Sequence, residues 1–361
     1  MQHLSLYRKY RPKTFEEVRG QEHIVSALSA ALKNGTVSHA YLFCGSRGTG
    51  KTSIARIFAR TLETNDDDLY EIDAASNRGI DDVRALREAA HTLPFRSKYK
   101  VYIIDEVHML TKDAFNALLK TLEEPPRHVI FILATTEGEK LPETVVSRCQ
   151  VFTFKKPSQR ILKDLVLTVA KKEGTMLLPA SADLIAMLGD GSFRDTHGVL
   201  EKVLNAYNGK QLSVEDVEEL VGAPRSILVN ALIAAVADKA LPQALQAIDA
   251  ASASGTDMRV FMRLVLQKMR FILLLRFANT MEREIEQAFS ESDLTLVRQY
   301  AQNKDAFITT DVLRDMLVAY EQIPRAIIPQ LPIELALMRL LGESRDMPLL
   351  KGIAISRAAA S

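Results

Sequence analysis

Eight consecutive residues carry the clearest chemical pattern in this chain, because they match G-x-x-x-x-G-K-[ST] without a gap. They are Gly45, Ser46, Arg47, Gly48, Thr49, Gly50, Lys51 and Thr52. In such a loop, glycines let backbone N–H groups close around phosphate oxygens, and the start of the next helix adds partial positive charge. Lys51 is expected to reach the β- and γ-phosphates, and the Thr52 hydroxyl to bind Mg²⁺. The flanking residues disfavour an ordinary glycine turn, so the run predicts a nucleoside triphosphate site.

An acidic pair follows an apolar run further along the chain. Residues 101–104 are Val, Tyr, Ile and Ile, and they precede Asp105 and Glu106. Open α/β sheets bind ligands at the carboxyl ends of their strands, where the phosphate loop is also expected. Asp105 would hold Mg²⁺ through oxygen, and Glu106 would orient or deprotonate an attacking water. An isolated pair of this kind is more often two solvated carboxylates, but the phosphate loop reverses that preference.

Two further residues fit the same chemistry. Thr136 follows an apolar run, where its hydroxyl can contact the γ-phosphate or the water. Arg148 lies between Ser147 and Cys149 and is a candidate arginine finger, which spreads the charge of the transition state. Taken alone, a threonine at a strand end is usually a strand former and an arginine is usually a surface residue.

The elements that would position these residues alternate between strand-like and helix-like patterns. Short apolar runs rich in Val, Ile, Phe and Tyr predict five strands, at residues 40–43, 69–73, 100–104, 129–134 and 150–154. Helix-length segments separate them, which is typical of an α/β fold with a parallel sheet covered by helices on both faces.

Two of these helices have clear sequence signals. One is capped by Thr111 or Asp113, ends before Pro125, and places one apolar face inward through Phe115, Leu118, Leu119 and Leu122. The other begins near Asp81 and Asp82, and it is expected to bury Val83, Leu86, Ala90 and Leu93.

The strand signals end near residue 156, which predicts a change of architecture. We expect a nucleotide-binding α/β domain over residues 1–156 and a small helical lid over residues 157–223. An all-helical collar would follow over residues 224–345, and residues 346–361 would form a tail. The sequence contains no internal repeat of fixed period.

Composition narrows the function classes. The chain has 361 residues, 47% of them hydrophobic and 25% charged, with a net charge of +1, so any nucleic-acid contact must come from a local patch. It has two cysteines, Cys44 and Cys149, which excludes a disulfide framework and makes a zinc site of thiolates improbable. The first residues lack a signal-peptide core, and charges interrupt the apolar stretch 260–275, so we expect a cytoplasmic protein without a membrane partner.

These motifs together resemble the AAA+ ATPases of bacterial clamp loaders, and among them the gamma/tau family of DNA polymerase III. The resemblance rests on the phosphate loop and on residues 7–15, 20–23, 71–76, 105–110, 116–126 and 147–149. It is dense through residue 156, continues at residues 191–195, and beyond residue 224 is compatible with a helical collar.

The resemblance implies specific roles for several residues. Lys51 and Thr52 would bind ATP and Mg²⁺, with Asp105 as the metal acid and Glu106 as the catalytic base. Thr136 would be sensor 1, Arg194 would be sensor 2 in the lid, and Arg148 would act on the ATP of a neighbouring subunit. The adenine would be enclosed by Tyr7, Arg11, Pro12 and Val18. Contacts to the backbone of duplex DNA would come from Lys112, Lys120 and Arg78, for which solvated surface charge is an equal alternative.

One departure from the family pattern affects the cofactor prediction. Family members commonly insert a four-cysteine zinc module after the helix of the phosphate loop, whereas residues 61–68 here form a short acidic link without cysteine. We therefore expect ATP and Mg²⁺ but no zinc. The sequence also contains no long C-terminal extension, so it does not support binding of polymerase or helicase.

The implied function is that of an ATPase within DNA polymerase III, a nucleotidyltransferase complex. ATP would assemble a ring of five clamp-loader subunits that opens a sliding clamp, and primer-template DNA would trigger hydrolysis and release. The alternative is a non-hydrolysing scaffold or clamp-binding subunit, which would not need Lys51, Asp105 and Glu106 together. A small-molecule phosphotransferase would not need the collar, and a branch-migration motor would need a strand-containing domain after residue 224.

Overall fold

The computed structural model describes residues 4–206, 212, 214–277 and 291–342. Contacts within the chain group it into two units, Met1–Leu212 and Ser213–Ser361, and each is described by itself. This grouping does not separate residues 157–212 from the preceding α/β part, so the division into three domains stays a prediction. The expected tail, residues 346–361, lies outside the described residues.

The first unit is built on a parallel sheet of five strands in the order β2-β3-β4-β1-β5. The strands are β1 (Ala40–Cys44), β2 (Leu69–Asp73), β3 (Lys100–Asp105), β4 (Val129–Thr135) and β5 (Gln150–Thr153). Every residue of β4 is buried, as expected for a central strand covered on both faces. The register pairs Asp73 with Asp105 and Cys44 with Thr135, so the carboxyl ends of four strands meet at one edge.

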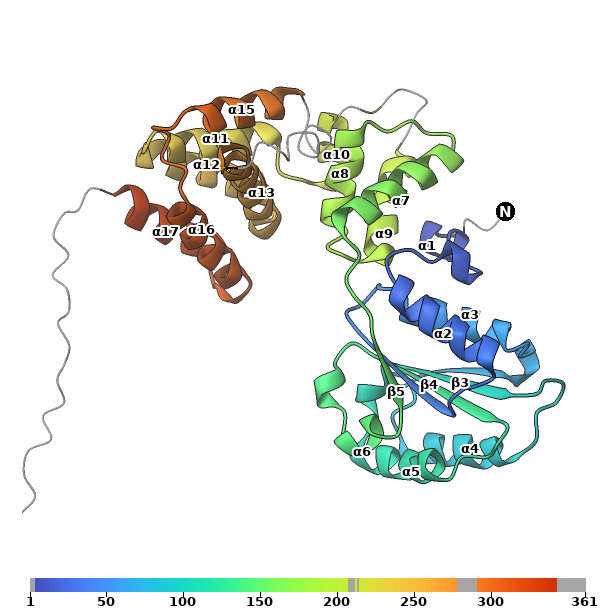
Figure 1. The fold of residues 1–361 in the computed structure, drawn as a ribbon. Coiled ribbons are helices and arrows are strands. Elements are labelled where there is room, and N and C mark those ends of the chain that lie inside the picture. Colours follow the sequence, from blue (N-terminus) through green and yellow to red (C-terminus); the bar gives the residue numbers. More distant parts are fainter. Residues whose placement is uncertain (1–3, 207–211, 213, 278–290, 343–361) are drawn as a thin grey trace, which may run out of the picture. The chain divides into compact units, whose positions relative to one another are not determined.

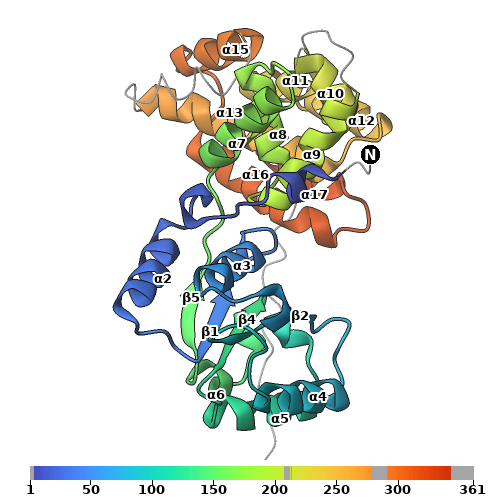
Figure 2. The ribbon, with the colours of Figure 1, turned by 90° about the vertical axis from the view of Figure 1, so that its right-hand side faces the viewer.

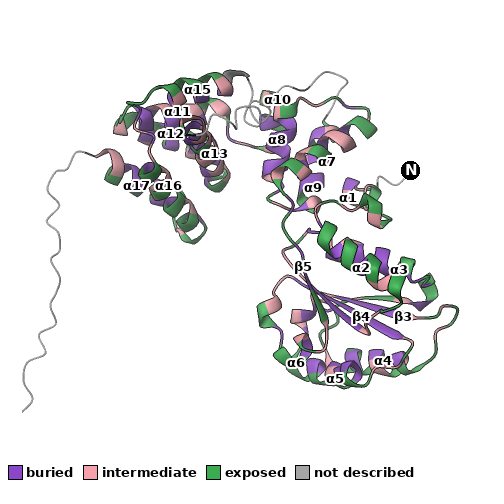
Figure 3. Cartoon of the chain, in the orientation of Figure 1, coloured by how far each residue is buried: buried purple, intermediate pink, exposed green. Residues whose placement is uncertain are grey.

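Helices cover both faces of this sheet (Figures 1 and 2). One face carries α2 (Glu22–Asn34) and α3 (Lys51–Thr61), and the other carries α4 (Ile80–His91), α5 (Lys112–Glu123) and α6 (Glu143–Val146). Each helix turns its buried residues toward the strands and leaves its outer face exposed (Figure 3). Two separate hydrophobic cores result, one on each face of the sheet. The predicted α/β architecture is confirmed.

The two helices with clear sequence signals form as expected, with one error. Thr111 caps α5, because its hydroxyl accepts a hydrogen bond from the Ala114 N–H. Leu93, however, is 78% exposed, so the prediction that it is buried was wrong. The chain leaves α4 at Thr92, which is already extended, and a residue before proline, as Leu93 is, also favours extended backbone.

The remainder of the first unit is helical. Two N-terminal elements, α1 (Leu6–Lys9) and η1 (Phe15–Glu17), precede the sheet, and α7 (Gln159–Lys172), α8 (Pro179–Leu188) and α9 (Phe193–Asn205) follow it. Short 3₁₀ turns lie between strands and helices, at η2 (Asp66–Asp68), η3 (Val107–Met109) and η4 (Gly138–Lys140). Lys9 forms an ion pair of 2.6 Å with Glu173, and the Tyr10 hydroxyl bonds to the same carboxylate. The N-terminal segment is therefore attached to the end of α7.

The described residues of the second unit contain helices and no strand. They form α10 (Val214–Val221), α11 (Ser226–Ala237), α12 (Leu241–Ala253), α13 (Met258–Phe277), α15 (Glu291–Gln302), α16 (Thr310–Gln322), η6 (Ile323–Arg325) and α17 (Leu331–Leu341). Their apolar faces share one core, in which Ile233, Phe261 and Met316 have no exposed surface. Within the described residues, no single helix is long and apolar enough to cross a membrane, and one pair bent by 100°, α10 with α11, passes that test only together.

Candidate active site

The phosphate loop lies between β1 and α3, at the carboxyl edge of the sheet. Gly50 is the N-cap of α3 with φ +102, and a Cβ there would meet no atom within 4 Å, which leaves space for a ligand. Gly48 has φ +73, and a Cβ there would lie 1.9 Å from Ser192 Oγ. Glycine is therefore required at Gly48 because the loop packs against the start of α9.

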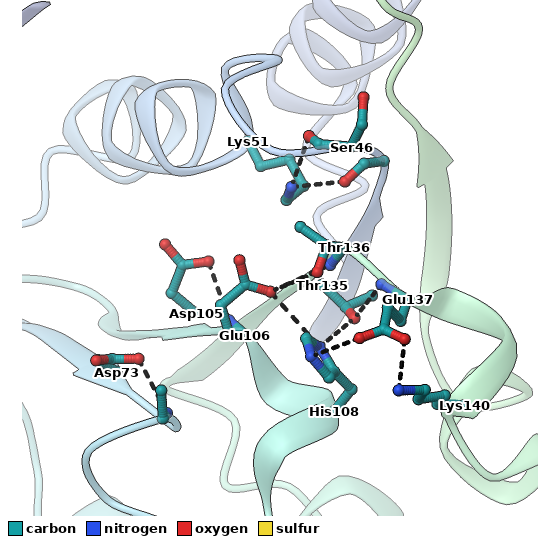
Figure 4. A network of polar contacts seen from close by, with 12 residues as sticks. Ser46, Lys51, Asp73, Asp105, Glu106, His108, Thr135, Thr136, Glu137 and Lys140 are labelled. Atoms are coloured by element: carbon teal, nitrogen blue, oxygen red, sulfur yellow. Dashed lines mark hydrogen bonds and ion pairs between the residues drawn. The ribbon is translucent and has the colours of Figure 1, made fainter. Parts of the chain in front are cut away.

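Lys51 is held at the centre of this loop. Its ammonium donates hydrogen bonds to the carbonyl oxygens of Gly45, at 2.7 Å, and Ser46, at 3.1 Å (Figure 4). Burial lowers the pKa of Lys51, and the nearby Glu106 and Asp105 carboxylates oppose that shift. A buried ammonium satisfied only by backbone carbonyls can exchange them for phosphate oxygens, which carry more negative charge.

Thr52 and Asp105, the two residues predicted to bind magnesium, are in direct contact. The Thr52 hydroxyl donates to Asp105 Oδ2 at 2.7 Å, so a hydroxyl and a carboxylate meet beside the loop. Mg²⁺ prefers oxygen ligands and commonly keeps positions for waters and substrate phosphates. Two protein oxygens with a phosphate loop next to them fit that requirement. Among the described residues, no group of three or more His, Cys, Asp or Glu side chains is placed to hold a metal ion.

Glu106 follows Asp105 with a left-handed backbone, at φ +48. Such a conformation is uncommon for glutamate and is typical of functional sites. Its Oε2 accepts two hydrogen bonds from Thr136, one from the N–H at 3.2 Å and one from the hydroxyl at 3.0 Å (Figure 4). The predicted catalytic base and the predicted sensor are thus in direct contact, although they follow different strands, β3 and β4.

A pocket of about 710 Å³ lies above these residues, within the size range of ligand sites. Most of the predicted nucleotide-binding residues line it, namely Tyr7, Arg11, Pro12, Val18, Arg47, Gly48, Thr49, Gly50, Lys51 and Thr52. Asp105, Glu106 and Arg194 line it as well. Gly45 and Ser46 contribute through the carbonyls that hold Lys51. The first unit therefore brings the predicted base-binding, phosphate-binding and acidic residues to one cavity.

Arg194 reaches this pocket from the first turn of α9. Its guanidinium lies 5.0 Å from the centre of the Tyr7 ring, within the distance of a cation–π contact. The adjacent Phe193 N–H donates to the carbonyl oxygen of Gly48 at 2.9 Å, which joins α9 directly to the phosphate loop. Arg194 therefore lines the pocket of its own subunit, and its sensor 2 role stays a prediction.

Arg148 is placed differently. It follows α6, forms an ion pair of 2.7 Å with Glu123, and donates to the Thr144 carbonyl oxygen at 2.6 Å. Among the described residues that line the pocket, Arg148 is absent, as are Lys112, Lys120 and Arg78.

The three residues predicted to contact DNA lie on the surface. Lys112 and Lys120 are exposed on α5, and Arg78 is exposed with its Nε donating to the Ala75 carbonyl oxygen at 2.6 Å. The structure does not test the DNA roles of these three residues.

Two polar residues of this site received no role from the sequence. The buried Gln21 amide donates to the Lys155 carbonyl oxygen at 2.7 Å and to the Thr49 carbonyl oxygen at 3.4 Å, so it joins the start of α2 to the loop. His108 lies beside Glu106 and is 7% exposed. Both belong to the quoted motifs, but their roles depend on partners distant in sequence.

Two families match this chain. The family described as "DNA polymerase III, delta subunit" matches residues 20–77 and 63–158. The family described as "DNA polymerase III subunits gamma and tau domain III" matches residues 212–353.

Individual relatives agree with these matches. The tau subunit of DNA polymerase III from Bacillus subtilis is 40% identical over 79% of this chain and 54% of its own length, and that of Escherichia coli is 32% identical over 97% and 57%. The gamma subunit from Buchnera aphidicola is 31% identical over 94% of this chain and 99% of its own length. The chain therefore spans about half the length of the tau relatives.

Solved structures support the fold. The RuvB Holliday junction branch migration motor of Thermotoga maritima matches with a TM-score of 0.51 and 22% identity, over 69% of this chain and 86% of that one. At this identity the match supports the AAA+ fold and nothing about function.

Proposed function

The chain belongs to the gamma/tau family of DNA polymerase III subunits, and from this premise we propose that it binds ATP with Mg²⁺ and hydrolyses it as a subunit of a clamp loader. The observation that carries the proposal is the meeting of Lys51, Thr52, Asp105, Glu106 and Thr136 at one edge of the sheet. A scaffold that only binds nucleotide would not need a glutamate held beside the sensor threonine.

Each residue has a role that follows from its contacts. Lys51 and the N–H groups of the loop bind the phosphates, and Tyr7 with Val18 encloses the base. Thr52 and Asp105 hold Mg²⁺, which, when bound, neutralises charge on the β- and γ-phosphates. Glu106 accepts a proton from the attacking water, while Thr136 fixes the orientation of that carboxylate.

Arg148 acts on the ATP of a neighbouring subunit. Its guanidinium is held by Glu123 and the Thr144 carbonyl oxygen, away from the residues that line its own pocket. An arginine finger supplied by another subunit makes hydrolysis depend on assembly. A ring of five subunits, in which ATP lies between neighbours, satisfies this requirement.

ATP binding and hydrolysis then drive the loading of a sliding clamp. The γ-phosphate is contacted by the loop, by Arg194 and by a neighbour's arginine, so its loss removes contacts that favour the assembled state. Primer-template DNA triggers that loss, with Lys112, Lys120 and Arg78 contacting its phosphates. DNA synthesis itself is not assigned to this chain.

Steady-state ATP hydrolysis, measured with and without sliding clamp and primed DNA, tests the proposal. Lys51→Ala should remove both ATP binding and turnover. Arg148→Ala should keep ATP affinity and reduce the stimulated rate by about 1,000-fold, the scale of an arginine finger. Arg84→Ala, which removes an exposed arginine of α4, is the control and should behave as the native chain.

The outcomes separate the parts of the proposal. If the native chain binds ATP but does not hydrolyse it with clamp, DNA and companion subunits, the scaffold function is correct. If Arg148→Ala loses ATP binding while turnover per bound ATP is unchanged, Arg148 does not act on a neighbour.

A further inference from the structure

His108 lies beside the catalytic carboxylate and has no role in the function proposed above. It is the middle residue of η3, two positions after Glu106, and its side chain is 7% exposed. Its Nδ1 lies 2.9 Å from the Thr135 hydroxyl oxygen and 3.5 Å from Glu106 Oε2, and its Nε2 lies 3.3 Å from Glu137 Oε1 (Figure 4). The ring therefore lies between two carboxylates at the ends of β3 and β4.

The neighbours of the ring determine what each nitrogen does. A carboxylate only accepts hydrogen bonds, so Nε2 carries the proton that faces Glu137. The Thr135 hydroxyl oxygen accepts the Glu137 N–H at 3.0 Å, which leaves its own proton for Nδ1. Glu137 is fixed in turn by an ion pair with Lys140. Each partner of the imidazole is thus held by a further contact.

The Glu106 carboxylate is enclosed by this arrangement on two sides. Thr136 donates to Oε2 from one side, and the His108 ring borders the same oxygen from the other. Within the described part of the chain, the second oxygen, Oε1, has no hydrogen-bond partner. One oxygen is therefore fixed and the other is available to the pocket that Glu106 lines.

We propose that His108 is a positioning residue for Glu106. Its ring, oriented by Thr135 and Glu137, prevents the Glu106 carboxylate from rotating away from Thr136, so that Oε1 faces the attacking water. This inference rests on the proposed ATP hydrolysis and adds the group that keeps the base in its productive orientation. Among the described residues that line the pocket His108 is absent, so its removal should change turnover and leave nucleotide affinity intact.

Three substitutions at His108 distinguish the two ring nitrogens. Asparagine places an amide near the position of Nδ1, glutamine places one near the position of Nε2, and leucine supplies neither. His108→Leu and His108→Gln should lower kcat about 10-fold to 100-fold, as the loss of an orienting partner does elsewhere. His108→Asn should retain kcat within about 3-fold, because its Oδ1 can accept the Thr135 hydroxyl proton in place of Nδ1.

Two further variants complete the experiment with the full chain, its companion subunits, clamp and primed DNA. Thr135→Val removes the hydroxyl that orients the ring and leaves Glu106 itself unchanged. It should lower kcat, as His108→Leu does. His128→Leu is the matched control, since the His128 Nε2 bonds to the Ala90 and Thr92 carbonyl oxygens and His128 is not among the described residues that line the pocket. ATP affinity is measured for every variant by titration without turnover.

The result expected is a fall in kcat with unchanged ATP affinity, restored by asparagine and not by glutamine. If kcat stays at the native value in all three His108 variants, or if ATP affinity, thermal stability and kcat fall together, His108 does not position the base. A native chain without ATP hydrolysis would instead contradict the proposed function, so the two failures are distinguishable.

Discussion

Carboxylates of the same type behave differently in this protein because their nearest donors differ. Burial raises the pKa of Asp183 in α8 to about 6, against the smaller opposing effects of Lys163 and a hydrogen bond from Gln159. Burial also acts on Asp68, but three backbone N–H groups donate to it and together lower its pKa to about 2. Neither residue lines the nucleotide pocket, so a shifted carboxylate here marks a structural position as readily as a catalytic one.

Replacing Asp68 with asparagine should destabilise the first unit. The Asp68 carboxylate accepts hydrogen bonds from the N–H groups of Phe95, Arg96 and Ser97, at 2.6, 2.9 and 2.8 Å. An amide keeps one acceptor oxygen and turns its NH₂ toward a donor, so we expect a loss of about 2 kcal/mol in the free energy of unfolding at pH 7. Urea unfolding of the full chain measures it.

The pH dependence of this loss has a defined sign. The folded pKa of Asp68 is depressed, so its contribution is complete above the ordinary value of 3.8 and is lost as pH falls toward about 2. The stability difference between the native chain and Asp68→Asn should therefore shrink below pH 4. Asp67→Asn, which changes an exposed neighbour, is the control. An equal loss in both variants would contradict the role of the buried carboxylate.

At the level of elements, local sequence patterns were enough to predict most of the strands and helices of the first unit. The phosphate loop, the acidic pair after β3 and the five apolar runs predicted a parallel sheet with its site at the carboxyl edge. The sequence could not show which member of the run Asp66, Asp67 and Asp68 is buried, because its partners lie about 27 residues further along the chain. His108 and Gln21 were missed for the same reason, and Leu93 was misplaced because the exact end of α4 follows from Thr92 and Pro94 rather than from helical period.

The contact between the phosphate loop and α9 should couple ATP binding to the position of that helix. In Gly48→Ala, the new Cβ would lie 1.9 Å from Ser192 Oγ and 2.9 Å from Ser192 Cβ, so α9 or the loop must move. We expect ATP affinity to fall at least about 10-fold, with about 1 kcal/mol of added backbone strain. Isothermal titration with a non-hydrolysable ATP analogue measures the affinity.

A second substitution separates crowding from strain. Ser192→Gly removes both clashing atoms and costs only a few tenths of a kcal/mol as an N-cap, so the pair Gly48→Ala with Ser192→Gly should recover most of the affinity. Gly35→Ala has a similar positive φ of +68 with no atom within 4 Å of its Cβ, and it reports the cost of strain alone. Failure of the pair to recover any affinity would show that crowding against α9 is not the cause.

For the whole molecule, the two units have separate interiors. The hydrophobic clusters of the sheet lie between Ile24 and Phe154, whereas the cluster of the second unit lies between Val229 and Leu337. Every described residue of this chain that lines the nucleotide pocket belongs to the first unit. Loss of packing in the helical unit should therefore leave ATP binding intact and affect the functions that we assign to assembly.

The second unit contains a buried charge pair whose removal tests whether ATP binding is independent of packing in the helical unit. Lys268 and Asp293, 2% and 6% exposed, lie 2.6 Å apart, and both contact Asn230. Burial lowers the pKa of Lys268, and Asp293 opposes that shift. Lys268→Met removes the cation that lies 2.6 Å from the buried Asp293 carboxylate, so we expect the second unit to lose about 3 to 5 kcal/mol and to melt separately in calorimetry.

The charge, rather than the packing of the lysine stem, should account for this loss. Adding Asp293→Asn to Lys268→Met also removes the negative charge that Lys268 balances and keeps a group that can bond to Asn230, so it should restore part of the stability. Arg314→Met removes an exposed arginine that pairs with Asp311 at 3.0 Å and with Asp315 at 3.7 Å, and it should cost less than about 0.5 kcal/mol. ATP affinity should remain native in all three variants, while association with companion subunits falls with the stability of the helical unit. A parallel fall in ATP affinity would mean that the two units fold and bind as one.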